Sequence, residues 1–168
     1  MKLIKNIAYR SINLEGEVFF PLFERYIRFS THNYEGNADL DLTYVNQCAA
    51  YLNSLSDDLI NRLCQGSIMY CNYYLDEYLG EDQKEFINCR DVLSLITPLN
   101  LSIPKMKRNE PIVHLELDCE WEPEHGMEWI VRGDRVLYIG SFESEDPWDE
   151  FPERERYING GKFENFAC

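Results

Sequence analysis

The clearest pattern in the chain is a strict alternation of apolar and polar residues that begins after Pro111. The apolar positions are Val113, Leu115, Leu117, Cys119 and Trp121, and the polar positions between them are His114, Glu116, Asp118, Glu120 and Glu122. Successive side chains of a strand point to opposite faces of a sheet, so the alternation predicts a half-buried strand. We therefore expect the carboxylates of this segment on the surface.

Shorter apolar runs predict the other strands. Residues 127–131 and 135–139 flank Gly133 and Asp134, a pair that is typical of the tight turn of a hairpin. The remaining β-like runs lie in the N-terminal segment 6–34, around a break at Pro21, and at residues 99–103. Because these runs are short and separated by turn residues, we expect antiparallel sheet structure.

The helical pattern lies in the middle of the chain, over residues 43–96. Apolar residues spaced by three and four predict one helix near Val45 and a second that begins at Ser56, a good N-cap followed by two aspartates. The second helix is expected to end at Gly80, which gives a length of ~24 residues or ~36 Å. A shorter helix is expected near residues 81–95.

These elements predict an α+β fold with a single domain. Antiparallel β-sheet is expected to pack on the long central helix, with one or two shorter helices beside it. A chain of 168 residues is of the usual size for one domain. Its expected segments are an N-terminal β segment 6–34, a helical segment 43–96, a C-terminal β segment 99–140 and an irregular acidic tail 141–168.

Charge is the property of the composition that bears most on function. The chain has 16 Lys and Arg residues against 30 Asp and Glu, a formal net charge of −14. Residues 1–109 hold 11 basic and 14 acidic side chains, whereas residues 110–168 hold 5 and 16. The net negative charge excludes a protein that binds nucleic acid through a basic surface. The acidity of the last third can instead steer a basic protein partner onto this part of the chain.

The expected location is the cytoplasm. No apolar run approaches the ~18–20 residues that a membrane span needs, and the first residues lack the features of a signal peptide. The chain has six cysteines without a CxxC pair, and we expect them to be reduced thiols. No glycine-rich phosphate loop or metalloprotease motif occurs in the sequence, so no cofactor or membrane partner is predicted.

Residues 118–126 read DCEWEPEHG and lead directly into the predicted hairpin. With PLNLSIP before it and RGDRVLYIG after it, this segment resembles a group of bacterial proteins of unknown function that carry a D-C-x-W-[DE]-x-E-H-G strand and hairpin. The resemblance covers residues 92–142. Some small acidic proteins of this kind resemble immunity proteins of bacterial toxin systems. The resemblance therefore implies a fold segment more than an activity.

Besides partner binding, the segment Trp121–Gly126 has three interpretations. In the structural one, Pro123 fixes φ, Gly126 permits a positive φ, and Glu124 or His125 binds exposed backbone groups of a tight connection. In the second, a metal ion is held by Asp118, Glu120, Glu122, Glu124 and His125. In the third, Glu124 and His125 act as general acid and base, although neighbours on a strand face opposite ways.

Residues 142–151, FESEDPWDEF, combine carboxylates with large aromatic side chains. The acidic residues are Glu143, Glu145, Asp146, Asp149 and Glu150, and the aromatic residues are Phe142, Trp148 and Phe151. An aromatic anchor surrounded by steering charge is typical of a surface that binds a cationic partner. We predict that this segment, with Glu116, Asp118, Glu120 and Glu122, forms a partner-binding surface. A solvated loop is the alternative.

These features favour a non-enzymatic cytoplasmic immunity protein that binds and neutralises a basic toxin domain, with a nuclease as the expected target. Nucleases carry positive clefts for phosphate, and an acidic protein can occupy such a cleft. The alternatives are a metal-dependent or acid/base enzyme that uses the segment Asp118–His125, and an adaptor for another partner. The sequence leaves the oligomeric state open.

Overall fold

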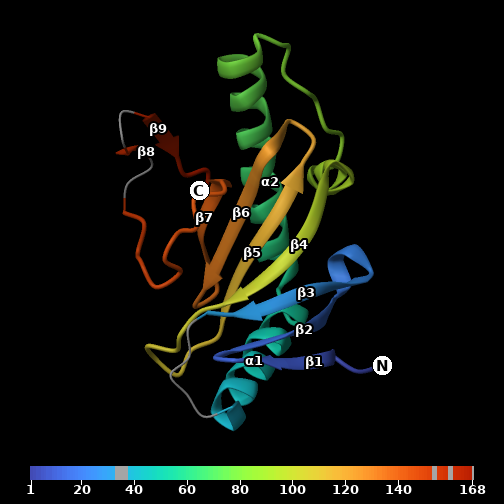
Figure 1. Ribbon diagram of the computed structural model, residues 1–168. Coiled ribbons are helices and arrows are strands. Elements are labelled where there is room, and N and C mark those ends of the chain that lie inside the picture. The colour runs from blue at the N-terminus through green and yellow to red at the C-terminus, as the bar shows by residue number, and fades with distance from the viewer. Residues whose placement is uncertain (33–37, 153–154, 159–160, 168) are drawn as a thin grey trace.

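The computed structural model describes residues 1–32, 38–152, 155–158 and 161–167. It is a single α+β domain built on one seven-stranded sheet, with a separate two-stranded hairpin. The large sheet contains β1 Ile4–Arg10, β2 Asn13–Phe20, β3 Arg25–Thr31, β4 Ile96–Ile103, β5 Ile112–Cys119, β6 Glu122–Arg132 and β7 Arg135–Ser141. The hairpin contains β8 Glu155–Ile158 and β9 Gly161–Glu164. The strands of the large sheet lie in chain order (Figure 1).

Parallel pairing of β3 with β4 joins the N-terminal and C-terminal strands into one sheet. Arg28 pairs with Asn100 and Thr31 with Ile103 in parallel register, whereas the other neighbouring strands pair antiparallel. The predicted antiparallel arrangement is therefore wrong at this one junction, and the sheet is mixed. The physical reason is the helical segment between β3 and β4, because only a long crossover connection can bring the chain back in the same direction.

The helices α1, Ala38–Asn53, and α2, Asp57–Tyr74, pack on the same face of the sheet (Figure 1). α2 starts where the sequence predicts, since the Ser56 side chain accepts a hydrogen bond from the backbone N–H of Leu59 at 3.2 Å. Its 18 residues continue into a five-residue π-helical turn, η2 Leu75–Leu79, which ends at Gly80 with φ of +62°. The long helix is therefore α-helical up to Tyr74 and π-helical in its last turn.

The helix predicted near residues 81–95 is largely absent. The side-chain amide of Asn72 bonds both the N–H and the carbonyl oxygen of Lys84, which holds this stretch in an irregular conformation beside α2. Asn88 then caps a short 3-10 helix, η3 Cys89–Leu95, through a capping box with Asp91. The short helix η1, Pro21–Phe23, occurs at the predicted break around Pro21. In residues 81–95, hydrogen bonds between side chains and the backbone thus take the place of a regular α-helix.

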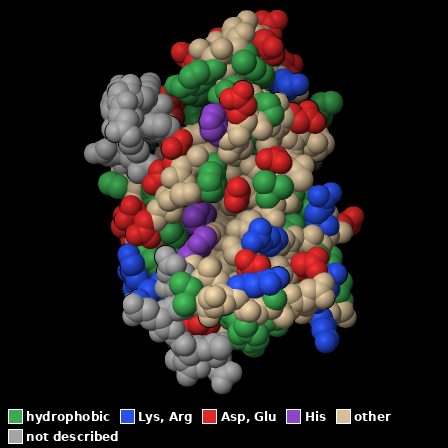
Figure 2. Space-filling model, viewed as in Figure 1, with side chains coloured by type: hydrophobic (Ala, Val, Ile, Leu, Met, Phe, Trp, Pro, Cys, Tyr) green, Lys and Arg blue, Asp and Glu red, His purple; other side chains and the backbone are tan. Residues whose placement is uncertain are grey.

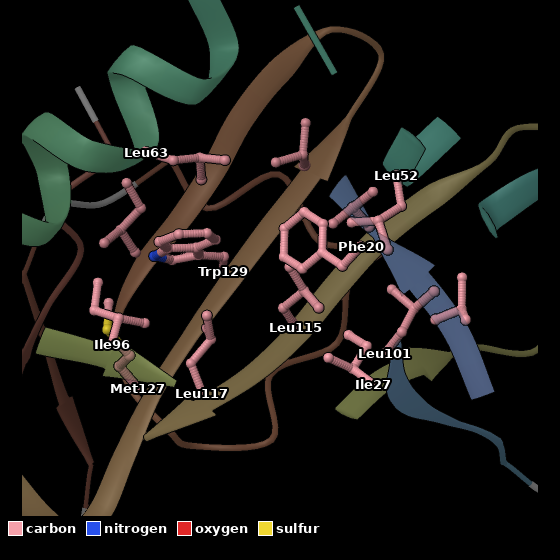
Figure 3. Close-up of a cluster of buried hydrophobic side chains, with 14 of the residues drawn as sticks. Phe20, Ile27, Leu52, Leu63, Ile96, Leu101, Leu115, Leu117, Met127 and Trp129 are labelled. Atoms are coloured by element: carbon pink, nitrogen blue, oxygen red, sulfur yellow. The ribbon is translucent and has the colours of Figure 1, made fainter. Parts of the chain in front are cut away.

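The core lies between the helices and the inner face of the sheet. The alternate residues of β5 that were predicted to be buried are buried here, together with Trp129 of β6 (Figure 3). The Trp129 indole N–H donates to the hydroxyl of Ser67 at 3.0 Å, and this hydroxyl donates to the carbonyl oxygen of Leu63 at 2.7 Å. These two successive buried hydrogen bonds therefore fix β6 against α2.

Five cysteines lie in the described part of the chain, and all five are free thiols. Cys48, Cys64, Cys71 and Cys119 are buried and Cys89 is half-buried. Burial raises the pKa of Cys64 and Cys119 to about 12, so these thiols stay protonated near neutral pH. Cys168 lies outside the described residues. None of the described helices is long and apolar enough to cross a membrane.

Candidate partner-binding surface

Residues 142–151, which we call the strap, lie against the outer face of the sheet, opposite the helices. Two buried side chains of β6 hold the strap. Arg132 donates from Nη1 to the carbonyl oxygen of Pro147 at 2.6 Å, and the Glu128 Oε1 atom accepts from the backbone N–H of Glu143 at 3.0 Å. Both β6 residues are at most 1% exposed. The strap is therefore part of the folded domain, although it lies in the segment predicted to be an irregular tail.

The strap uses two of its predicted partner-binding carboxylates in ion pairs within the domain. Glu150 bridges Arg132 and Arg135, with N···O distances of 2.7 Å and 3.1 Å. The hydrogen bond from Arg135 and the charge of Arg132 lower the pKa of Glu150. Asp146 pairs with Lys107 at 3.2 Å. The steering charge of the strap is thus partly neutralised by neighbouring cations.

Trp148, the predicted anchor, packs on the hydrophobic core of the domain itself. Its indole N–H donates to the carbonyl oxygen of Lys105 at 2.9 Å, and the guanidinium groups of Arg108 and Arg132 lie 5.2 Å and 5.8 Å from its ring centroid. The remaining strap carboxylates are Glu143 and Asp149, which are exposed, and Glu145, which is half-buried. Trp148 therefore anchors the strap to its own domain.

The strap and the outer sheet face line a pocket of about 480 Å³. Its floor includes His114, predicted to be on the exposed face but buried under the strap, with its Nε2 atom 2.5 Å from Oε2 of Glu128. His32 lines the rim and contacts the hydroxyl of Ser102. Burial and the nearby His114 lower the pKa of His32, which favours the neutral ring. Glu116 also lines this pocket and is half-buried.

The segment Trp121–Gly126 has the positive φ at Gly126 that its structural interpretation predicts, although Gly126 lies inside β6, where the pairing with β5 is irregular, and not in the turn itself. β5 ends at Cys119 instead of continuing to Glu122, and the chain turns before it enters β6. Gly126 has φ of +74°, and a Cβ atom there would lie 2.5 Å from the carbonyl oxygen of Leu117. The side chain of Trp121 is buried. Glycine is therefore required at this position by both conformation and space.

Glu122 is buried and does not lie on the exposed face of β5. Its Oε1 atom accepts from the backbone N–H groups of Glu124 and His125 at 3.1 Å and 3.3 Å, and its Oε2 atom lies 2.8 Å from Nδ1 of His125. The partner of His125 is thus Glu122 and not Glu124, the pair considered from the sequence. The hydrogen bond and the negative charge of Glu122 raise the pKa of His125 above its usual value.

We expect an NMR titration to give His125 a pKa above 6.5, and the variant Glu122→Gln to move it back toward 6.5. Protonated His125 stabilises the folded state at pH values below 6.5. This contribution to stability is lost as the pH rises through the raised pKa of His125. Glu124→Gln is the control, because Glu124 acts on His125 only through charge at longer range and should shift the pKa less. Equal shifts in both variants would contradict the assigned contact.

The metal-site interpretation gains no geometric support. Within residues 1–32, 38–152, 155–158 and 161–167, no group of three or more His, Cys, Asp or Glu side chains is placed to hold a metal ion. Asp118, Glu120 and Glu124 are exposed around the connection, whereas Glu122 is buried beneath it. The predicted acidic residues of this segment are thus split between surface and interior.

Exposed carboxylates gather at the end of the domain formed by the end of α2, the loop after it and the β5–β6 connection (Figure 1). We call this surface the acidic end. Its residues are Asp76, Glu77, Glu81, Asp82, Glu85, Asp118, Glu120 and Glu124. Figure 2 shows acidic side chains over the whole visible face, whereas most Lys and Arg side chains lie in its lower half. The upper half of this face therefore carries mostly negative charge.

Large apolar side chains are exposed beside these carboxylates. Tyr78 is 58% exposed, Leu79 is 48% exposed and Ile87 is fully exposed. The sequence interpretation missed this part of the surface, because it treated residues 75–95 as helical and searched for acidic residues only in the last third. The signal was present in the run DEYLGEDQKE at residues 76–85, where carboxylates surround Tyr78 and Leu79.

A second pocket, of about 460 Å³, adjoins the acidic end. We call it the tyrosine pocket, and its lining residues are Tyr70, Tyr73, Tyr74, Tyr78, Glu122, His125, Ser141, Phe142, Glu143, Glu164 and Phe166. Four tyrosines from the end of α2 and η2 form one wall, and three glutamates lie among the other lining residues. The predicted residues Glu122, His125 and Glu143 thus meet here, from parts of the chain that are distant in sequence.

The family model for a domain of unknown function, DUF6985, matches residues 3–146. The chain belongs to this family. Comparison with the curated proteins and with the solved structures finds no match. The DUF6985 match covers β1 to β7, α2 and the β5–β6 connection, and it ends within the strap. The acidic end and most of the tyrosine pocket therefore belong to the DUF6985 domain, whereas Trp148, Glu150 and Glu164 follow it.

Proposed function

We propose that this protein is a non-enzymatic immunity protein of a bacterial toxin system, which binds a basic toxin domain in the cytoplasm and blocks its active site. A nuclease is the proposed target, because a nuclease must present positive charge to its phosphate substrate. The chain would occupy that positive cleft in place of nucleic acid. The charge distribution of the chain supports this proposal.

The acidic end is the observation that carries the proposal. Eight exposed carboxylates surround exposed apolar side chains there, and Lys84 is the one Lys or Arg within the stretch 76–88. Charge at the rim steers association, and apolar or aromatic groups at the centre supply the tight contact. The strap is a poorer candidate than the sequence suggests, because Asp146, Trp148 and Glu150 bind groups of their own domain.

An enzyme that uses the segment Asp118–His125 is less well supported. The two carboxylate oxygens of Glu122 already bind backbone N–H groups and His125, so they are not arranged to activate a substrate or water. Asp118 and Glu120 are exposed and line neither of the two pockets described above, so they do not enclose a small-molecule substrate. The same residues fit a protein-binding surface.

The proposed function is tested with the full chain and the purified basic nuclease domain encoded directly beside its gene. Added in equal amount, the chain should abolish cleavage of DNA or RNA by this domain, and expression of both proteins together should restore growth. Glu24→Lys, an exposed residue remote from the acidic end, is the control variant and should inhibit like the unchanged chain. Full nuclease activity in the presence of excess chain would contradict the proposal.

A further inference from the structure

We propose that the tyrosine pocket binds the guanidinium group of an arginine side chain that the basic partner inserts into it. This inference rests on the proposed function for the source of the arginine, but the pocket itself can be tested without the partner.

The aromatic wall supplies flat, electron-rich faces. The rings of Tyr74 and Tyr78 stack with centroids 4.9 Å apart, and the ring of Tyr73 meets that of Tyr78 edge to face at 6.1 Å. Tyr73 also packs against Phe166 at 5.4 Å, which holds the wall in place. Such rings attract a cation placed over their faces, and a planar guanidinium can stack on them as well.

The charge of the pocket matches a cation. Glu122, Glu143 and Glu164 line it, and no Lys or Arg is among its described lining residues. His125 also lines the pocket, and its Nδ1 atom already pairs with the Glu122 carboxylate at 2.8 Å. Glu143 accepts a hydrogen bond from the hydroxyl of Ser141 at 3.1 Å, and its second oxygen accepts none from the described residues, so it can take a further donor. A guanidinium has five donors in a fixed fork, so it can reach a carboxylate while it stacks on a ring.

A buried hydroxyl provides a third, independent observation. Tyr70 lines the pocket and is 4% exposed, and its hydroxyl has no hydrogen-bond partner among the described residues. Burial first, and then nearby groups that include Glu122, raise the pKa of this phenol, so it is neutral. A buried hydroxyl without a partner is costly, and an N–H donor that reaches it removes that cost. The free pocket is therefore prepared for a ligand that donates hydrogen bonds.

The test uses N-acetyl-arginine methylamide as the probe and follows NMR shifts of the full chain. We expect saturable shifts at His125 and Gly126, with affinity several-fold weaker for the lysine analogue and no saturation with the alanine analogue. Tyr78→Ala should weaken probe binding roughly five- to tenfold, because a cation–π contact is lost. Tyr9→Ala, an exposed tyrosine of β1 that is 60% exposed, is the matched control and should leave the affinity unchanged.

Tyr70→Phe keeps the inference testable should Tyr78→Ala disturb the pocket. This variant should unfold at the same or a higher temperature and still bind the probe several-fold more weakly. No saturable shift, equal affinity for arginine and lysine probes, or unchanged binding in both tyrosine variants would each overturn the inference. A nuclease that is still inhibited by Tyr78→Ala with unchanged affinity would overturn the arginine pocket and leave the proposed function standing.

Discussion

Replacement of Glu128 by leucine should lower the free energy of unfolding by about 3–5 kcal/mol, because it removes a buried acceptor and leaves several donors unpaired, at a cost of about 1–3 kcal/mol for each such group. Glu128 is fully buried and accepts from the backbone N–H groups of Glu143 and Glu145 at 3.0 Å and 3.4 Å, while its other oxygen contacts His114. Leucine leaves all three groups unpaired, so the strap should also detach. Chemical denaturation measures the loss, and limited proteolysis within residues 142–151 measures the detachment.

Glu116→Leu is the matched control for this prediction. Glu116 lies opposite Glu128 in the pairing of β5 with β6, but it is half-buried and holds no strap backbone. Its replacement should change stability by no more than about 1 kcal/mol. Equal losses in the two variants would show that the buried contacts of Glu128 do not hold the strap.

Replacement of Gly126 by alanine should destabilise the protein by about 3 kcal/mol, because two costs act together. The backbone has φ of +74°, where an L-residue costs about 1–2 kcal/mol. The new Cβ would also lie 2.5 Å from the carbonyl oxygen of Leu117, and a clash with fixed backbone typically adds about 1–3 kcal/mol.

Gly80→Ala separates these two costs. Gly80 has φ of +62°, but no heavy atom lies within 4 Å of the position of its Cβ. Its replacement should therefore cost about 1 kcal/mol, the conformational part alone. If thermal or urea unfolding shows equal losses for Gly80→Ala and Gly126→Ala, the close approach of β6 to β5 at Gly126 is not the source of the constraint.

The sequence predicts those features of the fold that depend only on residues close to one another along the chain. The N-cap at Ser56 and the stop at Gly80 depend on neighbouring residues, and both occur as predicted. The turn at Gly133 and Asp134 is also local, with φ values of +58° and +54°. The parallel pairing of β3 with β4 joins residues 72 positions apart, such as Arg28 and Asn100, and short-range periodicity contains no information about it.

The burial of polar residues is the part that the sequence could not predict. Alternation in β5 correctly separates its two faces, but it cannot reveal that a later segment covers His114 on the polar face. The strap does so because Arg132 and Glu128, two buried polar residues in the C-terminal half of β6, bind its backbone. Glu122 is misplaced for a similar reason, since the turn before β6 interrupts an alternation that continues in the sequence.

The central claim is that the acidic end meets a basic partner, and the association rate with the toxin domain at several salt concentrations tests it most directly. The pair Glu120→Lys and Glu124→Lys should slow association at least about tenfold at low salt and flatten its salt dependence, because steering charge acts on encounter and is screened by ions. The pair Glu24→Lys and Asp149→Lys changes the net charge equally at exposed positions outside the acidic end, and it should have a much smaller effect. Equal slowing by both pairs would show that only net charge matters, and unchanged rates for the first pair would place the interface elsewhere.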